Sequence, residues 1–97
     1  MTKAEIKDYL DNYTERKAVA AFRQKQGNTE DRTVVVIKAI EECMLTLPDG
    51  LGEILRMVYI EKQSLRKISN QHYACKDTIA RRRDEGITIM SKCLEGL

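Results

Sequence analysis

Apolar residues recur at three- and four-residue spacing along most of the chain, which is typical of amphipathic helices. The first run lies before Gly27, a residue type common just past a helix end. Thr2 and Glu5 have the spacing of a capping box, which indicates a helix start. We therefore predict one helix from about residue 3 to Gly27. Its inward positions are Ile6, Tyr9, Leu10, Tyr13, Lys17 (through its stem), Ala20 and Ala21.

A second helix is predicted between Asn28 and Leu47. Its first residues combine cap-forming side chains with acids that suit a helix N-terminus. The β-branched run Val34–Ile37 is also compatible with a strand, but no other segment alternates in a way that would pair with it. Helix is therefore favoured. Its inward positions are Val36, Ile37, Ile40, Cys43, Met44 and Leu47.

A third helix is expected to begin with Pro48 in its first turn, where proline is well tolerated. Its inward positions are Leu51, Ile54, Leu55 and Val58.

The last third of the chain has the spacing of a helix-turn-helix. Ser64 is a suitable N-cap for a short helix that ends near Tyr73. A second helix is predicted from about Lys76 to about Leu94. The helices of such a unit cross at a small residue, a requirement that Ser69 meets. The other positions between the two helices are Leu65, Ile68, Ala74 and Ile79.

The turn between these two helices departs from the usual pattern. Tyr73 falls where a positive φ is needed, which costs a bulky residue about 1 kcal/mol. Cys75 falls at the cap of the second helix and is a poorer cap than serine. On that helix Arg83 faces inward, so it is expected to snorkel or to pair with an acid such as Glu53 or Glu85.

Gly86 also faces inward, where it is expected to permit the close approach of an N-terminal helix. The remaining inward positions are Ile87, Met90 and Leu94, and the outward ones are Asp77, Thr78, Arg81, Asp84, Glu85 and Thr88.

Composition narrows the class of protein. The 97 residues suit one domain, and 42% hydrophobic with 33% charged residues indicates a globular chain. No apolar run approaches the ~18 residues of a membrane span, and the first residues lack the apolar core of a signal peptide. The three cysteines form no CxxC pair, so neither a disulfide framework nor a zinc site is indicated. A cytoplasmic protein without a cofactor is expected.

Positive charge is concentrated although the net charge is only +2. Residues 62–83 contain seven Lys or Arg side chains and one acid, Asp77. Such a window is typical of phosphate binding, although charge blocks also occur on solvated helix faces. The seven cations are Lys62, Arg66, Lys67, Lys76, Arg81, Arg82 and Arg83.

The helix-turn-helix register favours DNA contact over a merely solvated face. The outer face at the start of the second helix would enter the major groove, with the residues Lys76, Asp77, Thr78, Ala80 and Arg81. Arg81 suits a guanine edge, and Asp77 suits a cytosine or the orientation of Arg81. Arg82 suits a phosphate. The supporting helix would contact the DNA backbone through Ser64, Arg66 and Lys67.

Six short segments of residues 47–94 form one further pattern: Leu47-Pro48, Ile54-Leu55, Tyr59-Ile60-Glu61, the Ser64–Ser69 segment, Thr78-Ile79 and Arg82. In these segments the chain resembles the fourth conserved region of sigma-70-type transcription factors. The whole chain also resembles small phage regulators of the ArpU/RinA type. These resemblances imply an all-α fold with N-terminal helices packed on a C-terminal helix-turn-helix. They further imply a phage late-gene activator that acts with RNA polymerase.

The resulting hypothesis is a sequence-specific regulator that binds double-stranded DNA and is not an enzyme. Residues 1–46 would form a helical pair for packing or dimerisation, and residues 47–97 the DNA-binding module, within one compact domain. The first helix would either pair between two subunits or fold back through Tyr9, Leu10 and Tyr13. Two alternatives remain: a small terminase-like DNA-packaging subunit, and a module that binds polymerase or a sigma factor without DNA.

Overall fold

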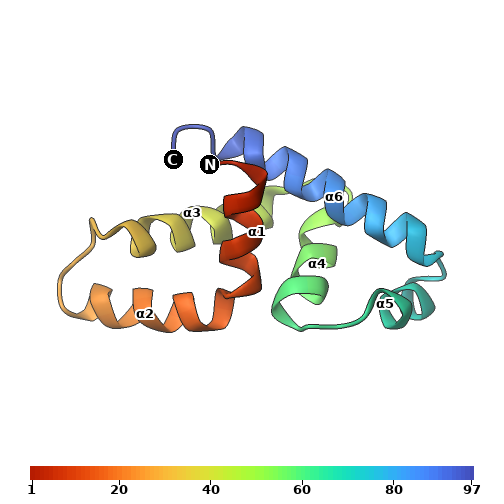
Figure 1. Cartoon of the computed structure of the whole chain (residues 1–97), viewed down its shortest axis with the longest axis horizontal. Coiled ribbons are helices and arrows are strands. Elements are labelled where there is room, and N and C mark those ends of the chain that lie inside the picture. Colours follow the sequence, from red (N-terminus) through yellow and green to blue (C-terminus); the bar gives the residue numbers. More distant parts are fainter.

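The structure, a computed structural model that describes all 97 residues, consists of helices joined by short turns (Figure 1). It contains no strand, so the predicted all-α class is confirmed and Val34–Ile37 is helical. None of its helices combines the length and the apolar character that crossing a membrane requires. The elements are α1 (Lys3–Asp11), α2 (Tyr13–Lys25), α3 (Arg32–Thr46), α4 (Leu51–Leu55), the π-helical turn η1 (Arg56–Ile60), α5 (Leu65–His72) and α6 (Lys76–Cys93).

The single helix predicted before Gly27 is wrong, because the chain bends at Asn12 into α1 and α2 (Figure 1). The Asn12 side-chain amide donates a hydrogen bond to the carbonyl oxygen of Asp8 at 3.0 Å. The Asn12 backbone amide donates to the same carbonyl oxygen at 3.2 Å, so Asn12 caps the end of α1. The bend lets α1 pack across α6 while α2 runs beside α3.

The main core lies where α1, α3, α4 and α6 meet. It joins residues from both ends of the chain, and the Met1 amino group donates to the Leu94 carbonyl oxygen at 2.7 Å. The predicted inward positions of α3 and α6 supply most of its side chains. Its nine buried members are Ile6, Leu10, Val36, Ile40, Cys43, Leu55, Ile87, Met90 and Leu94.

The α2–α3 hairpin has a smaller core of its own, made by Ala20, Val34 and Ile37. Tyr13 closes it by donating its hydroxyl to Glu41, which also pairs with Lys17 at 2.6 Å. Burial, with the bond to Glu41, raises the pKa of Tyr13 to about 12. Tyr9, Leu10 and Tyr13 therefore fold back onto the chain, which is one of the two arrangements expected for them.

Pro48 does not lie in the first turn of a helix, contrary to the sequence prediction. It opens a tight turn instead, since the Leu51 amide donates to the Pro48 carbonyl oxygen at 3.0 Å. Asp49 and Gly50 complete the turn with positive φ values of 56° and 74°. α4 then starts at Leu51 and presses Gly52 against the end of α3 at Met44.

Candidate nucleic-acid interface

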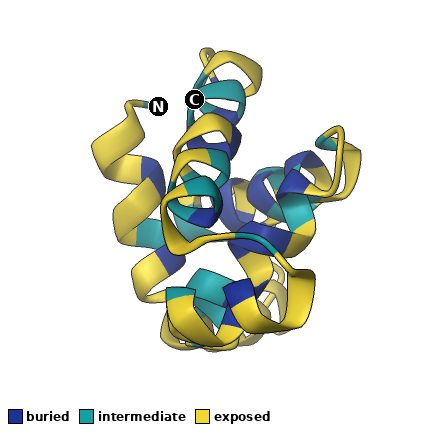
Figure 2. Cartoon of the chain, turned by 90° about the vertical axis from the view of Figure 1, so that its right-hand side faces the viewer, coloured by how far each residue is buried: buried dark blue, intermediate teal, exposed yellow.

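α5 and α6 are held together by a second apolar cluster. Ile68 and Ile79 are buried against Ile54 and Met57, and Leu65 and Ala74 pack around them. Ser69 is buried at the predicted crossing position, where its hydroxyl donates to the Arg66 carbonyl oxygen at 2.9 Å. Ile68, Ser69 and Ile79 are thus buried as predicted, and Figure 2, viewed from this end of the molecule, shows buried segments among the exposed ones.

The starts of α5 and α6 differ in the quality of their caps. Ser64 accepts a hydrogen bond from the Lys67 amide at 3.1 Å, as predicted for an N-cap. Cys75 makes no such bond at the start of α6, and its sulfur lies 3.0 Å from the Thr78 hydroxyl. Hydrogen bonding to Thr78 lowers the pKa of the exposed Cys75 thiol.

The turn between α5 and α6 contains a strained residue. Tyr73 has φ 53° and ψ 34°, which is the left-handed conformation that bulky residues avoid. Its side chain is 99% exposed, so packing within the chain does not compensate for the strain. The strain predicted at this position is therefore present.

Replacing Tyr73 with glycine is expected to raise the free energy of unfolding by about 0.5–1 kcal/mol, because glycine adopts this conformation freely. Urea denaturation measures the change. Tyr73→Ala is the matched control, since alanine removes the ring but keeps the strain. Equal stabilisation by both variants would show that backbone strain is not the cause.

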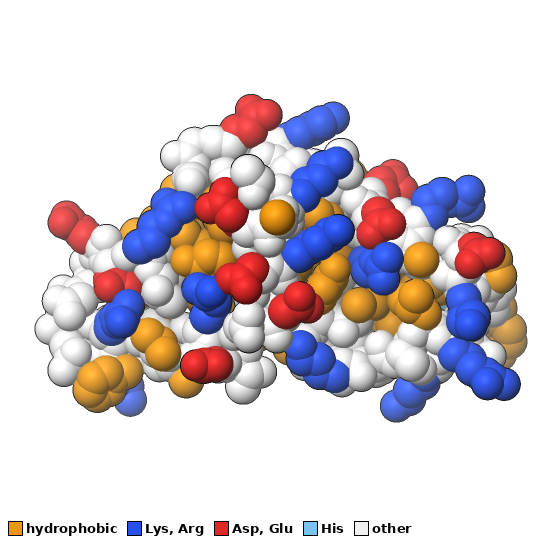
Figure 3. All heavy atoms as spheres, in the orientation of Figure 1, with side chains coloured by type: hydrophobic (Ala, Val, Ile, Leu, Met, Phe, Trp, Pro, Cys, Tyr) orange, Lys and Arg blue, Asp and Glu red, His pale blue; other side chains and the backbone are white.

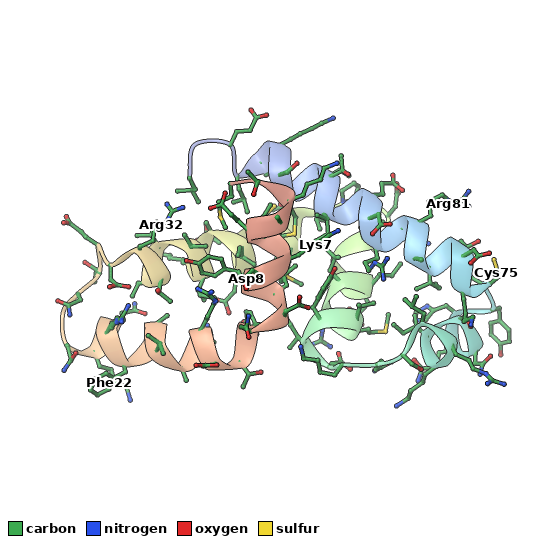
Figure 4. The ribbon with its side chains drawn as sticks, viewed as in Figure 1. Lys7, Asp8, Phe22, Arg32, Cys75 and Arg81 are labelled. Carbon is green, nitrogen blue, oxygen red and sulfur yellow. The ribbon has the colours of Figure 1, made fainter.

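The predicted groove-facing residues do lie on the outside of α6. Lys76, Asp77 and Arg81 are exposed, and Thr78 and Ala80 are half-buried. Figure 4 shows Arg81 pointing away from the body of the molecule. Asp77 and Arg81 form no ion pair, so the structure does not show the second of the two roles considered for Asp77, the orientation of Arg81.

α5 adds two further exposed cations, Arg66 and Lys67. Four cations at this end of the molecule, Arg66, Lys67, Lys76 and Arg81, have no ion-pair partner in the chain. We call these four residues the free basic set. Figure 3 shows Lys and Arg side chains along this right-hand end.

The other three cations of the basic window contact the protein itself. Arg82 donates to the carbonyl oxygen of Asp49 and is half-buried, so the structure places it beside the turn before α4. Lys62 donates to the Asp11 carbonyl oxygen at 2.9 Å. No local spacing in the sequence could reveal these two contacts, because their partners lie 33 and 51 positions away.

Two expectations about the inner side of α6 need correction. Arg83 pairs with its neighbour Asp84 at 3.1 Å and not with Glu53 or Glu85. Gly86 does permit a close approach, but the approaching helix is α4 and not an N-terminal one. A Cβ at Gly86 would lie 3.0 Å from Leu55 Cδ1. This contact sets how α6 lies on α4.

Comparison with known proteins finds no matching family model, no matching curated protein and no matching solved structure. No group of three or more His, Cys, Asp or Glu side chains is arranged to hold a metal ion. What this chain binds is therefore inferred from the geometry and charge of the α5–α6 end.

Proposed function

We propose that this chain is a sequence-specific regulator of transcription that binds double-stranded DNA through a sigma region 4-like helix-turn-helix. The setting proposed for it is activation of phage late genes together with RNA polymerase. The observation that carries the proposal is the free basic set on the outer surface of α5 and α6. Cations that no carboxylate neutralises are available to phosphates.

The packing of α5 on α6 supports this proposal. A helix presented to the major groove must have one face anchored, because loose side chains position no base contact. Ile79 is 1% exposed and anchors the start of α6 from behind, while Arg81 lies on the outside. In the proposed complex Lys76 and Arg81 contact the groove and its rim. Arg66 and Lys67 contact the backbone from α5.

The experiment is selection of bound fragments from random duplex DNA, followed by titration of the bound sequence with salt. If the free basic set contacts phosphates, the logarithm of the association constant should fall with the logarithm of salt concentration with a slope of about −3 to −4. Absence of measurable duplex binding at low salt, or a slope near zero, would refute the proposal.

A module that binds polymerase or a sigma factor without DNA is a second candidate, and one observation favours it. Leu45 is 86% exposed and borders a surface hollow together with Met44 and Leu47. Exposed apolar residues beside a hollow are typical of protein contact sites. Capture of purified polymerase combined with no DNA binding would select this candidate over the first.

A further inference from the structure

The outer face of α2 has no partner within the chain. Ala20 points toward α3 and is buried, and Phe22, about 160° around the helix from it, is 63% exposed. Ala18 and Val19 flank Phe22 and are also exposed. Figure 4 shows Phe22 projecting from α2 away from the rest of the molecule. Three apolar side chains thus share one solvent-facing strip.

The side chains of this strip would complement those of a second copy of α2 that runs antiparallel to it. Glu15, Ala18, Phe22 and Lys25 follow one another at spacings of three, four and three positions, which keeps them on one helix face. An antiparallel copy of the same helix would set Glu15 opposite Lys25 and Ala18 opposite Phe22. Each Glu15 carboxylate would then pair with a Lys25 ammonium group, and each Phe22 ring would pack on an Ala18 side chain.

Some charged side chains of α2 are paired within the chain and others are not, and this division agrees with the antiparallel pairing. Its other cations are paired within the chain: Arg16 with Asp8, Lys17 with Glu41 and Arg23 with Asp31. Glu15 and Lys25 have no ion-pair partner. They are ten positions apart, which is ~15 Å along a helix, so they cannot pair with each other within one chain.

We propose that this face binds the same face of a second copy of the chain, with the two α2 helices antiparallel. Phe22 of each copy packs on Ala18 of the other, and Glu15 of each pairs with Lys25 of the other. One helix pair buries less than the ~1,200 Å² of a standard stable interface. An interface of this size is typical of weak, reversible association.

This dimer would keep both free basic sets accessible. The long axis measures 45 Å, and α2 runs along one half of it while the α5–α6 turn lies at the far end of the other half (Figure 1). The two-fold axis of an antiparallel helix pair is perpendicular to both helices, so it places the two α5–α6 ends at the outer extremes of the dimer. The two copies would then contact separate duplex segments. Dimerisation itself does not depend on DNA binding.

Sedimentation equilibrium of the full chain at micromolar to submillimolar concentration tests the proposal. The unmodified chain should show a reversible monomer–dimer equilibrium, and Phe22→Asp should be monomeric. Leu45→Asp is the matched control, because Leu45 is also an exposed apolar residue but lies on α3. A monomeric unmodified chain, or dissociation by Leu45→Asp and not by Phe22→Asp, would overturn it.

Charge reversal tests the antiparallel register. Glu15→Lys or Lys25→Glu alone should weaken dimerisation by about tenfold at low salt, because two like-charged contacts replace two ion pairs. The double variant Glu15→Lys with Lys25→Glu should restore affinity to within about threefold, since the pairs re-form with exchanged signs. Circular dichroism establishes that each variant is folded. A folded double variant that stays monomeric contradicts this register.

Discussion

Replacing Gly52 with alanine is expected to lower the free energy of unfolding by about 2 kcal/mol. A methyl group at this position would overlap the carbonyl oxygen of Met44 and lie 3.2 Å from its carbon. The obstacle is backbone at the end of α3, so no side-chain rotation relieves it. Overpacking of this kind costs about 1–3 kcal/mol or more, which outweighs the ~1 kcal/mol that alanine gains over glycine in a helix.

Urea denaturation measures this effect, and for a domain of this size a 2 kcal/mol loss corresponds to a melting temperature lowered by about 10 °C. Gly96→Ala is the matched control, because a Cβ there meets no atom within 4 Å. That variant should change stability by less than about 0.5 kcal/mol. Equal stability of the two variants would show that α4 and α3 can separate without cost.

Replacing Lys76 and Arg81 together with alanine is expected to reduce affinity for the selected DNA by at least about tenfold. The loss of affinity should be larger if Arg81 contacts a guanine edge. Both side chains are exposed and unpaired, so the double alanine variant removes no interaction that stabilises the fold. The salt slope should become shallower by about one for each phosphate that the variant no longer neutralises. Fluorescence anisotropy across a salt series measures both quantities.

The control for this experiment removes the same charge elsewhere. Lys3 and Lys7 are exposed on α1 and have no ion-pair partner. Figure 4 shows Lys7 near the middle of the molecule. The double alanine variant of Lys3 and Lys7 should keep nearly full affinity, because α1 is remote from the α5–α6 turn. If both double variants lose affinity equally, the interaction depends on net charge and the proposed interface is wrong.

Local chemistry made α5 and α6 predictable. The correct predictions depend on features that a few neighbouring residues define. They are the Ser64 cap, the small Ser69, the inward Ile68 and Ile79 and the strained Tyr73. Helix hydrogen bonds and caps join neighbours three or four positions apart, so sequence spacing carries this information directly.

Long-range contacts were not predictable in the same way. Gly52 has the character of a weak helix former, but its missing side chain admits the Met44 carbonyl. Arg82 falls in the basic window but donates to Asp49. Each outcome depends on which distant element is adjacent, and no spacing encodes that.

The amino-acid sequence alone determined that this chain is helical, where most of its helices lie, and that positive charge gathers in residues 62–83. Only the tertiary structure decided which of those cations are free and which face of α2 stays uncovered. The physical reason is that helix formation depends on neighbours along the chain, whereas the availability of a side chain depends on the elements packed around it.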